Sequence, residues 1–164
     1  MKALWQPVYI AVGSNIENPR AQVQKAVDKL RTLAPEFRVV LVSPLYGTKP
    51  FGPVAQPDFV NGVIGALTQL DANTLLEKLQ AIEAALGRPA QREKWGPRVI
   101  DLDVLLHGRE QRQEPGLTLP HPGIVERNFV LYPLADIAPD LDVPGLGRIA
   151  ELKRRVAQAG IWPL

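Results

Sequence analysis

Hydrophobic and polar residues follow one another along the chain with two different spacings, which predict strands and helices in a definite order. Short apolar runs rich in β-branched and aromatic residues are typical of strands. They occur over 8–12, 37–46, 59–69 and 98–106. Apolar residues at helical spacing predict helices over 19–33 and 72–86. Asn18 and Asp71 stand at the starts of these helices, where each is a suitable N-cap.

This β-α-β-β-α-β order predicts a ferredoxin-like α+β fold, in which two helices pack on a mainly antiparallel sheet. A short strand, an apolar segment and a final helix are expected beyond it, over 117–119, 124–134 and 147–158. A length of 164 residues suits one domain, so we expect 1–164 to be a single domain. Two long connections rich in Pro and Gly, 47–58 and 87–97, are typical of functional loops.

Composition excludes several kinds of chemistry. The chain has no cysteine and two histidines, which rules out disulfides, thiolate metal sites, a cysteine nucleophile and His-rich metal sites. A divalent metal would therefore need oxygen ligands, as is typical of magnesium. The 19 Lys and Arg residues exceed the 17 Asp and Glu residues by two, a weak indication of nucleic-acid binding. No apolar run could span a membrane and no signal peptide is recognisable, so we expect a cytoplasmic protein without a membrane partner.

Asp101 and Asp103 are the strongest candidates for a functional site. They stand at i and i+2 in a predicted strand, so both side chains point to one face, with Cα atoms about 6.6 Å apart. Two adjacent carboxylates repel each other unless a cation lies between them, and such a pair could hold two metal ions. The alternative is a pair of surface aspartates, each paired with an arginine.

Basic residues crowd the segment before this pair. Four of them lie within eleven positions: Arg88, Arg92, Lys94 and Arg98. Farther along are Arg127 and a Pro-His-Pro turn that contains His121. Cations beside a metal-binding carboxylate pair suit a nucleoside triphosphate, whose oxygens bind both magnesium and arginine. A solvated loop and a hydrogen-bonded turn histidine are the alternatives.

Asn61 lies in a predicted strand that is otherwise apolar, two residues after Phe59. A buried asparagine is costly unless it is hydrogen-bonded. A heteroaromatic ligand with an amide-like edge would satisfy it, and Phe59, Trp95 or Phe129 could stack on such a ring. A hydrogen bond to the backbone of a loop is the alternative.

Five segments of the chain together carry a resemblance to a known family. They are WGPRVIDLD (95–103), LPHP (119–122), RNFVL (127–131), AVGSN (11–15) and QPDFVN (56–61). With these motifs the chain resembles the 6-hydroxymethyl-7,8-dihydropterin pyrophosphokinases, and the resemblance extends over 8–140. The first of the five segments is far more specific than an isolated pair of aspartates.

The resemblance implies that the pyrophosphoryl group of ATP is transferred to the hydroxymethyl oxygen of the pterin, leaving AMP, in folate biosynthesis. It also implies the ferredoxin-like fold, ATP as co-substrate and two Mg²⁺ ions held by Asp101 and Asp103. Arg98, His121 and Arg127 would complete the catalytic set by stabilising charge in the transition state. We further expect a monomer that binds no nucleic acid.

The resemblance also assigns binding residues, position by position. The pterin site would be lined by Thr48, Phe51, Phe59, Asn61, Trp95 and Phe129. The nucleotide would be bound by Gln80, Glu83, Arg88, Trp95, Arg98, Thr118, His121 and Arg127. The loops 47–58 and 87–97 would cover the site.

The chain departs from the family pattern where Ala90 and Gly116 replace frequent arginines and Phe59 replaces a common tyrosine. Arg92 could supply the cation that Ala90 lacks. Two other functions remain open: a ferredoxin-like RNA-binding module, favoured by the fold and the basic excess, and an inactive regulatory homologue. The chain lacks the R-G-F-x-F type of strand on which such RNA-binding modules stack bases.

Overall fold

The computed structural model describes residues 3–50, 52–88 and 96–164. Its strands are β1 (Gln6–Ser14), β2 (Phe37–Val42), β3 (Tyr46–Thr48), β4 (Phe59–Thr68), β5 (Asp101–His107), β6 (Arg112–Glu114), β7 (Leu117–Leu119), β8 (Asp142–Val143), β9 (Gly147–Arg148) and β10 (Ile161–Pro163). Its helices are α1 (Pro19–Arg31), α2 (Ala72–Ala85), α3 (Asn128–Ile137) and α4 (Ile149–Arg154). Within these ranges no helix is long and apolar enough to cross a membrane.

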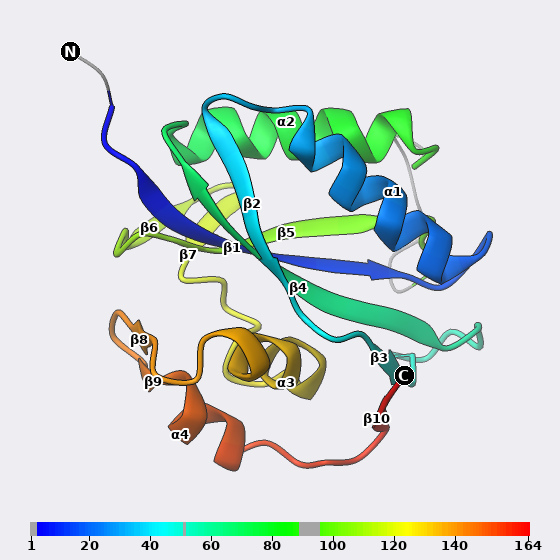
Figure 1. The fold of residues 1–164 in the computed structure, drawn as a ribbon. Coiled ribbons are helices and arrows are strands. Elements are labelled where there is room, and N and C mark those ends of the chain that lie inside the picture. Colours follow the sequence, from blue (N-terminus) through cyan, green and yellow to red (C-terminus); the bar gives the residue numbers. More distant parts are fainter. Residues whose placement is uncertain (1–2, 51, 89–95) are drawn as a thin grey trace.

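The central sheet is antiparallel and has the order β10-β3-β4-β1-β5, with β2 also paired to β4 (Figure 1). β2 and β3 pair with successive stretches of β4, so together they take the place of one ferredoxin strand. The predicted fold class is therefore confirmed. β1 and β4 lie in the centre of the sheet, and β5 follows β1 on the side away from β4.

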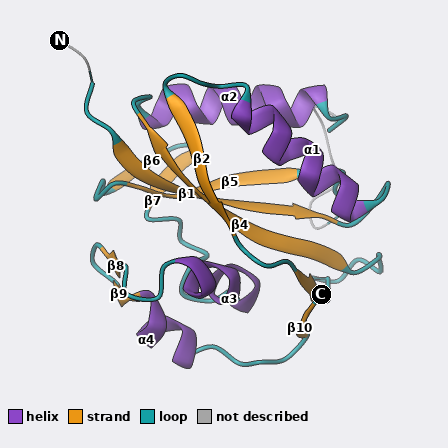
Figure 2. Ribbon diagram, viewed as in Figure 1, coloured by secondary structure: helices purple, strands orange, loops and turns teal. Residues whose placement is uncertain are grey.

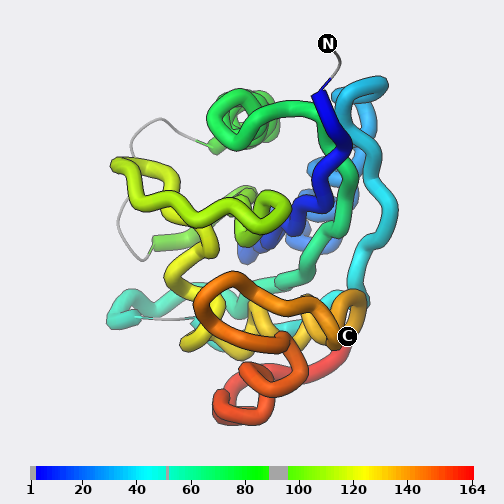
Figure 3. Tube along the Cα trace, turned by 90° about the vertical axis from the view of Figure 1, so that its left-hand side faces the viewer, coloured from blue at the N-terminus to red at the C-terminus, as the bar shows by residue number. Residues whose placement is uncertain are grey.

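Helices cover both faces of this sheet (Figure 2). Along β1, Val8, Ile10 and Val12 are buried in one core with α1 and α2. The alternate residues Tyr9 and Ala11 pack in a second core with α3 and α4. Seen from the side, the C-terminal part of the chain gathers below the sheet and α2 lies above it (Figure 3). Two covered faces explain why β1 and β4 are apolar at nearly every position.

The two predicted helix starts are confirmed. The Asn18 side chain accepts a hydrogen bond from Ala21 N at 3.4 Å, with Pro19 as the first helical residue. Asp71 accepts one from Thr74 N at 2.8 Å. α2 ends just before Gly87, whose φ of +102° makes it the expected left-handed terminator.

Several of the predicted boundaries are wrong. The final helix expected over 147–158 is limited to α4, because β9 precedes it. The apolar segment 124–134, for which no element was specified, forms α3 from Asn128. The strand 37–46 divides into β2 and β3, and β3 extends into the loop expected from residue 47. β5 begins at Asp101 rather than at residue 98.

β10 was not predicted, because three residues that end in Pro163 carry no periodicity. It pairs with β3 through Trp162, whose indole packs where a side chain at Gly47 would stand. The C-terminus is thereby attached to the edge of the sheet (Figure 1).

Candidate active site

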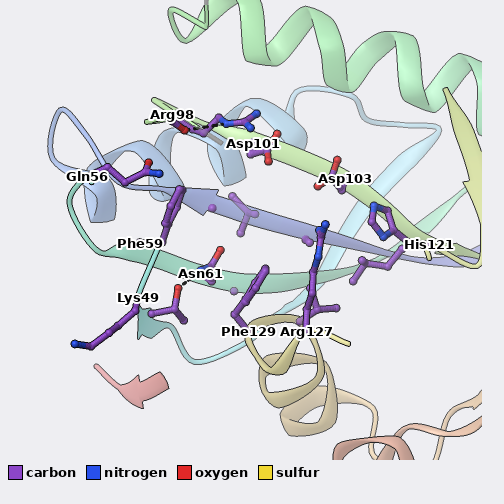
Figure 4. A pocket seen from close by; sticks show the side chains of 18 residues that line it. Lys49, Gln56, Phe59, Asn61, Arg98, Asp101, Asp103, His121, Arg127 and Phe129 are labelled. Carbon is purple, nitrogen blue, oxygen red and sulfur yellow. Dashed lines mark hydrogen bonds between the residues drawn. The ribbon is translucent and has the colours of Figure 1, made fainter. Parts of the chain in front are cut away.

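A pocket with an open volume of about 920 Å³ lies between the sheet and the start of α3 (Figure 4). Nine of the predicted site residues line it: Thr48, Phe59, Asn61, Arg98, Asp101, Asp103, His121, Arg127 and Phe129. They come from strands β3, β4 and β5, from the segments before β5 and after β7, and from α3. Residues more than 70 positions apart in the sequence are thus brought to one cavity.

Asp101 and Asp103 project into this pocket from β5, while Leu102 and Val104 are buried in the core on the opposite face. The predicted orientation of the pair is therefore confirmed. Their cross-strand partners on β1 are Gly13 and Ala11, two small residues that also line the pocket. Small partners leave open space directly beside the carboxylates.

The pKa of Asp103 is raised to about 7, mainly by burial and also by the charges of Asp101 and Glu83. Arg127 and Arg88 act in the opposite direction on this pKa. Burial also raises the pKa of Asp101, against the effect of the same two arginines. The two arginines therefore offset only part of the effect of burial and of the neighbouring carboxylates on these two pKa values.

Glu83 and Arg88 stand behind Asp101. Arg88 donates to Asp101 Oδ1 at 2.9 Å and is also ion-paired with Glu83. Glu83 also accepts a hydrogen bond from the Leu102 backbone N–H at 2.8 Å. Burial raises the pKa of Glu83 to about 7, although Leu102 N–H and Arg88 both lower it. The three side chains form a network that connects α2 to β5.

Two cationic side chains face the aspartates with unused hydrogen-bonding capacity. Among the described residues, Arg98 Nη1 is buried without a hydrogen-bond partner. Arg127 points toward Asp103 from the start of α3, and its guanidinium lies 5.7 Å from the centre of the Phe129 ring (Figure 4). Glycine at position 123 makes room for the Arg127 side chain, because a Cβ there would lie 2.8 Å from Arg127 Nε. Both arginines can therefore receive an anionic ligand.

His121 is oriented by its own turn. The Gly123 backbone N–H donates to His121 Nδ1 at 2.9 Å, so the neutral ring carries its proton on Nε2. Burial lowers the pKa of His121, and the charge of Arg127 lowers it further. The ring is thus a neutral donor at the pocket rather than a third cation.

The other end of the pocket is uncharged apart from Lys49, whose ammonium points away from Asn61 and Phe59 (Figure 4). Asn61 Nδ2 donates to the Thr48 side chain, at Oγ1, at 2.7 Å, rather than to the loop backbone that was the alternative to a ligand. A Cβ at position 13 would lie 2.5 Å from Asn61 Oδ1. The residue opposite Asn61 on β1 must therefore be glycine. Phe59 and Phe129 stand on either side of this amide (Figure 4).

Some predicted residues lie elsewhere. Gln80 is exposed on α2, and Thr118 is half-buried on β7; neither lines the pocket. Phe51 and Trp95 lie outside the described residues, as do Ala90, Arg92 and Lys94. Lys49 and Gln56 line the pocket but were not predicted as site residues. Gln56 belongs to the QPDFVN motif, which was a usable signal, whereas nothing in the sequence distinguishes Lys49.

Comparison with known proteins agrees with the geometry. The sequence profile described as "7,8-dihydro-6-hydroxymethylpterin-pyrophosphokinase (HPPK)" matches residues 9–139. A 2-amino-4-hydroxy-6-hydroxymethyldihydropteridine pyrophosphokinase of Pseudomonas aeruginosa is 50% identical over 147 residues, which cover 90% of this chain and 90% of that protein. A protein of the same name from Haemophilus influenzae is 42% identical over 149 residues, which cover 91% of this chain and 92% of the relative.

A solved structure resembles the fold at much lower identity. It is a Plasmodium falciparum HPPK-DHPS with pteroate, with a TM-score of 0.71 and 13% sequence identity. The match covers 94% of this chain and 43% of that longer chain. At such low identity it shows the fold alone.

Proposed function

The chain belongs to the 7,8-dihydro-6-hydroxymethylpterin-pyrophosphokinase family, and we propose that the pocket holds both substrates of the family reaction, one at each end. The enzyme transfers pyrophosphate from ATP to the hydroxymethyl group of the dihydropterin in folate synthesis. The observation that carries the proposal is the division of the pocket into an uncharged amide-aromatic end and a charged end. The RNA-binding alternative finds no support in the comparisons.

The uncharged end suits the pterin. Its ring is flat and heteroaromatic, with amide-like donors and acceptors on one edge. Asn61, held by Thr48, presents an oriented amide to such an edge, and Phe59 and Phe129 can pack on its faces. Phe51 and Trp95 remain proposed members of this site on the resemblance alone.

The charged end suits the triphosphate. Arg98 and Arg127 can each donate two parallel hydrogen bonds to phosphate oxygens, and His121 can donate one from Nε2. Arg88 stands next to Asp101 and is close enough to take part once phosphate competes for its guanidinium. Glu83 is proposed as the residue that orients Arg88. Gln80, Thr118 and Trp95 remain proposed nucleotide contacts on the resemblance alone.

Mg²⁺ fits the two aspartates. They offer oxygen ligands on one strand face, and a cation there would offset the burial and the neighbouring carboxylates that raise the pKa of Asp103. Among the described residues, no three His, Cys, Asp or Glu side chains form a closed metal cage. This suits an ion whose remaining ligands are phosphate oxygens and water. We propose two such ions at Asp101 and Asp103; a bound metal would neutralise triphosphate charge and polarise the phosphorus under attack.

The protein side of the reaction is then positioning and charge stabilisation. The uncharged end holds the pterin so that its hydroxymethyl group points to the charged end. Arg98 and Arg127 stabilise charge that develops on the phosphate oxygens during transfer. The neutral state of His121 makes it a hydrogen-bond donor in this step.

We also propose that residues 1–164 act as a single domain and a monomer in the cytoplasm. The continuous central sheet, to which the C-terminal β10 contributes, supports the single domain. Both ends of the pocket are built from one chain, so the proposed site does not require a residue of a second subunit.

The decisive assay mixes the enzyme with Mg-ATP and the hydroxymethyldihydropterin and separates the nucleotides. AMP that forms only when the pterin is present is the expected result. ADP as the product would contradict the transfer of pyrophosphate. No turnover would favour the inactive regulatory homologue.

A further inference from the structure

Asn15 lies directly after β1 and is 2% exposed. It does not line the pocket. Its side-chain amide nevertheless joins two segments that do, one from each side of the site. Both of its polar atoms are used, and each reaches more than 40 residues along the chain.

Asn15 holds the segment before β5 on the nucleotide side. The Arg98 backbone N–H donates to Asn15 Oδ1 at 2.8 Å, and the Asn15 backbone N–H donates to the Arg98 carbonyl at 3.0 Å. Ser14 Oγ adds a longer hydrogen bond to the same carbonyl at 3.5 Å. Both backbone polar groups of Arg98 are therefore held by the end of β1, which leaves its guanidinium to face the pocket.

The other atom of the amide holds the segment before β4 on the pterin side. Asn15 Nδ2 donates to the Pro57 carbonyl at 2.8 Å and to Gln56 Oε1 at 2.9 Å. Gln56 lines the pocket, and Phe59 begins β4 two residues after Pro57. A displacement of this segment therefore moves the aromatic wall of the pterin end.

A planar amide cannot shift one of its atoms without the other. Any movement of the Arg98 backbone on nucleotide binding either carries the Asn15 amide with it or breaks a buried hydrogen bond, which is costly. The same holds for movement of Gln56 and Pro57 when the pterin binds. Through this one side chain, the binding of the nucleotide and the binding of the pterin affect each other.

We propose that Asn15 is a positioning residue that couples nucleotide binding to pterin binding, by tying the Arg98 segment and the Gln56–Pro57 segment to one buried amide. This inference rests on the proposed assignment of the two substrates to the two ends of the pocket. Asn15 is not among the residues that line the pocket, so it acts through them. Through Asn15, the ligand that binds first fixes the position of the segment that receives the second ligand.

The discriminating variant is Asn15→Asp, which keeps the acceptor for Arg98 N and replaces the donor to Pro57 and Gln56 with an oxygen. Asn15→Leu removes both connections at similar volume. The matched control is Thr68→Val at the far end of β4, where the buried hydroxyl accepts from Leu70 N at 3.0 Å and donates to Glu36 O at 3.3 Å. Thr68 is remote from the pocket lining, so its variant reports the loss of buried hydrogen bonds alone.

Calorimetric titration measures the affinity of a non-hydrolysable Mg-ATP analogue and of the pterin, each alone and in the presence of the other. Allosteric coupling usually changes an affinity by about 5–150-fold and is reciprocal. We expect at least about fivefold coupling in the wild type and in Thr68→Val, and less than twofold in both Asn15 variants. Each ligand alone should bind within about threefold of the wild type.

Coupling retained in Asn15→Asp, or lost equally in Thr68→Val, would overturn the proposal. Failure of either ligand to bind the wild type would instead refute the proposed function, so the two failures are distinguishable. If the Asn15 variants do not fold, hydrogen exchange of the wild type decides. The nucleotide analogue alone should slow exchange at 56–60, and protection confined to the nucleotide side would contradict the coupling.

Discussion

The two ends of the pocket differ in how far the protein completes them before a ligand arrives. At the uncharged end, Asn61 already donates to Thr48 Oγ1, and Gly13 leaves room for the amide. At the charged end, Asp103 has a raised pKa, and Arg98 Nη1 is buried without a partner among the described residues. A recognition surface for a neutral ring can be preformed. A surface for a highly charged ligand stores unbalanced charge that the ligand itself neutralises.

The largest expected effect concerns the charged end. Asp103→Asn should lower kcat by about 100–1000-fold, the usual cost of removing a main electrostatic contact in a transition state. The fold should survive, because Asp103 faces the pocket and not the core. Steady-state kinetics measures kcat, and circular dichroism checks that the variant is folded. Asp140→Asn, at an exposed position, is the control. Normal turnover of Asp103→Asn would contradict the proposal that Asp103 binds the metal.

The next effect concerns the cations that face the aspartates. Arg127→Ala should lower kcat more than it raises KM for ATP, because the contact strengthens as charge develops. A charge-assisted hydrogen bond contributes about 1.5–3 kcal/mol, or roughly 10–150-fold in rate. Arg154→Ala, whose side chain is 77% exposed, should be neutral. An Arg127→Ala enzyme within about twofold of the wild type would place the charge stabilisation elsewhere.

A smaller and selective effect is expected at the uncharged end. Asn61→Leu should raise the KM for the pterin by about 5–150-fold, since an unpaired polar edge costs about 1–3 kcal/mol. The KM for ATP should change little. Asn73→Leu, on the exposed face of α2, is the control for the same change in side-chain chemistry. Equal effects on both substrates would show that the two ends are not separate.

The smallest effect is a dependence of stability on pH without ligand. Asp103 has a folded pKa of about 7 against an ordinary value of 3.8, so the folded protein keeps a proton that the unfolded chain loses. Stability should therefore fall as pH rises from about 4 to 7, and the effect should be complete above pH 7. Burial shifts the pKa of Glu83 in the same direction.

Thermal melts of the ligand-free enzyme measure this dependence. Asp103→Asn should raise the melting temperature by a few degrees at pH 8 and by less at pH 5, since about 1 kcal/mol shifts a protein of this size by about 2–4 °C. A lower melting temperature for Asp103→Asn at pH 8 would mean that the arginines already balance the pair.

The sequence predicts those features that depend on local periodicity. The strand that carries Asp101 and Asp103 places both on one face at any register, and the caps at Asn18 and Asp71 act within three residues. The element order then leads to the ferredoxin-like fold. The five family motifs together contain fourteen of the eighteen residues that line the pocket.

The rest depends on contacts between distant segments. The association of Arg88 with both Glu83 and Asp101 arises because α2 packs above β5, and no spacing in the sequence indicates it. The connection of Asn15 to Arg98 and Gln56 likewise appears only when three segments meet. Gln80 and Thr118 were expected at the site from resemblance alone, and the pocket lining includes neither of these polar residues.

The central claim is that the charged end is completed by a divalent cation at the aspartates. Titration of a non-hydrolysable ATP analogue, with and without Mg²⁺, into the wild type and Asp103→Asn tests it most directly. The account predicts that Mg²⁺ strengthens binding by at least about tenfold in the wild type and by less than twofold in the variant, a difference of about 1 kcal/mol or more. An equal gain from Mg²⁺ in both proteins would contradict it.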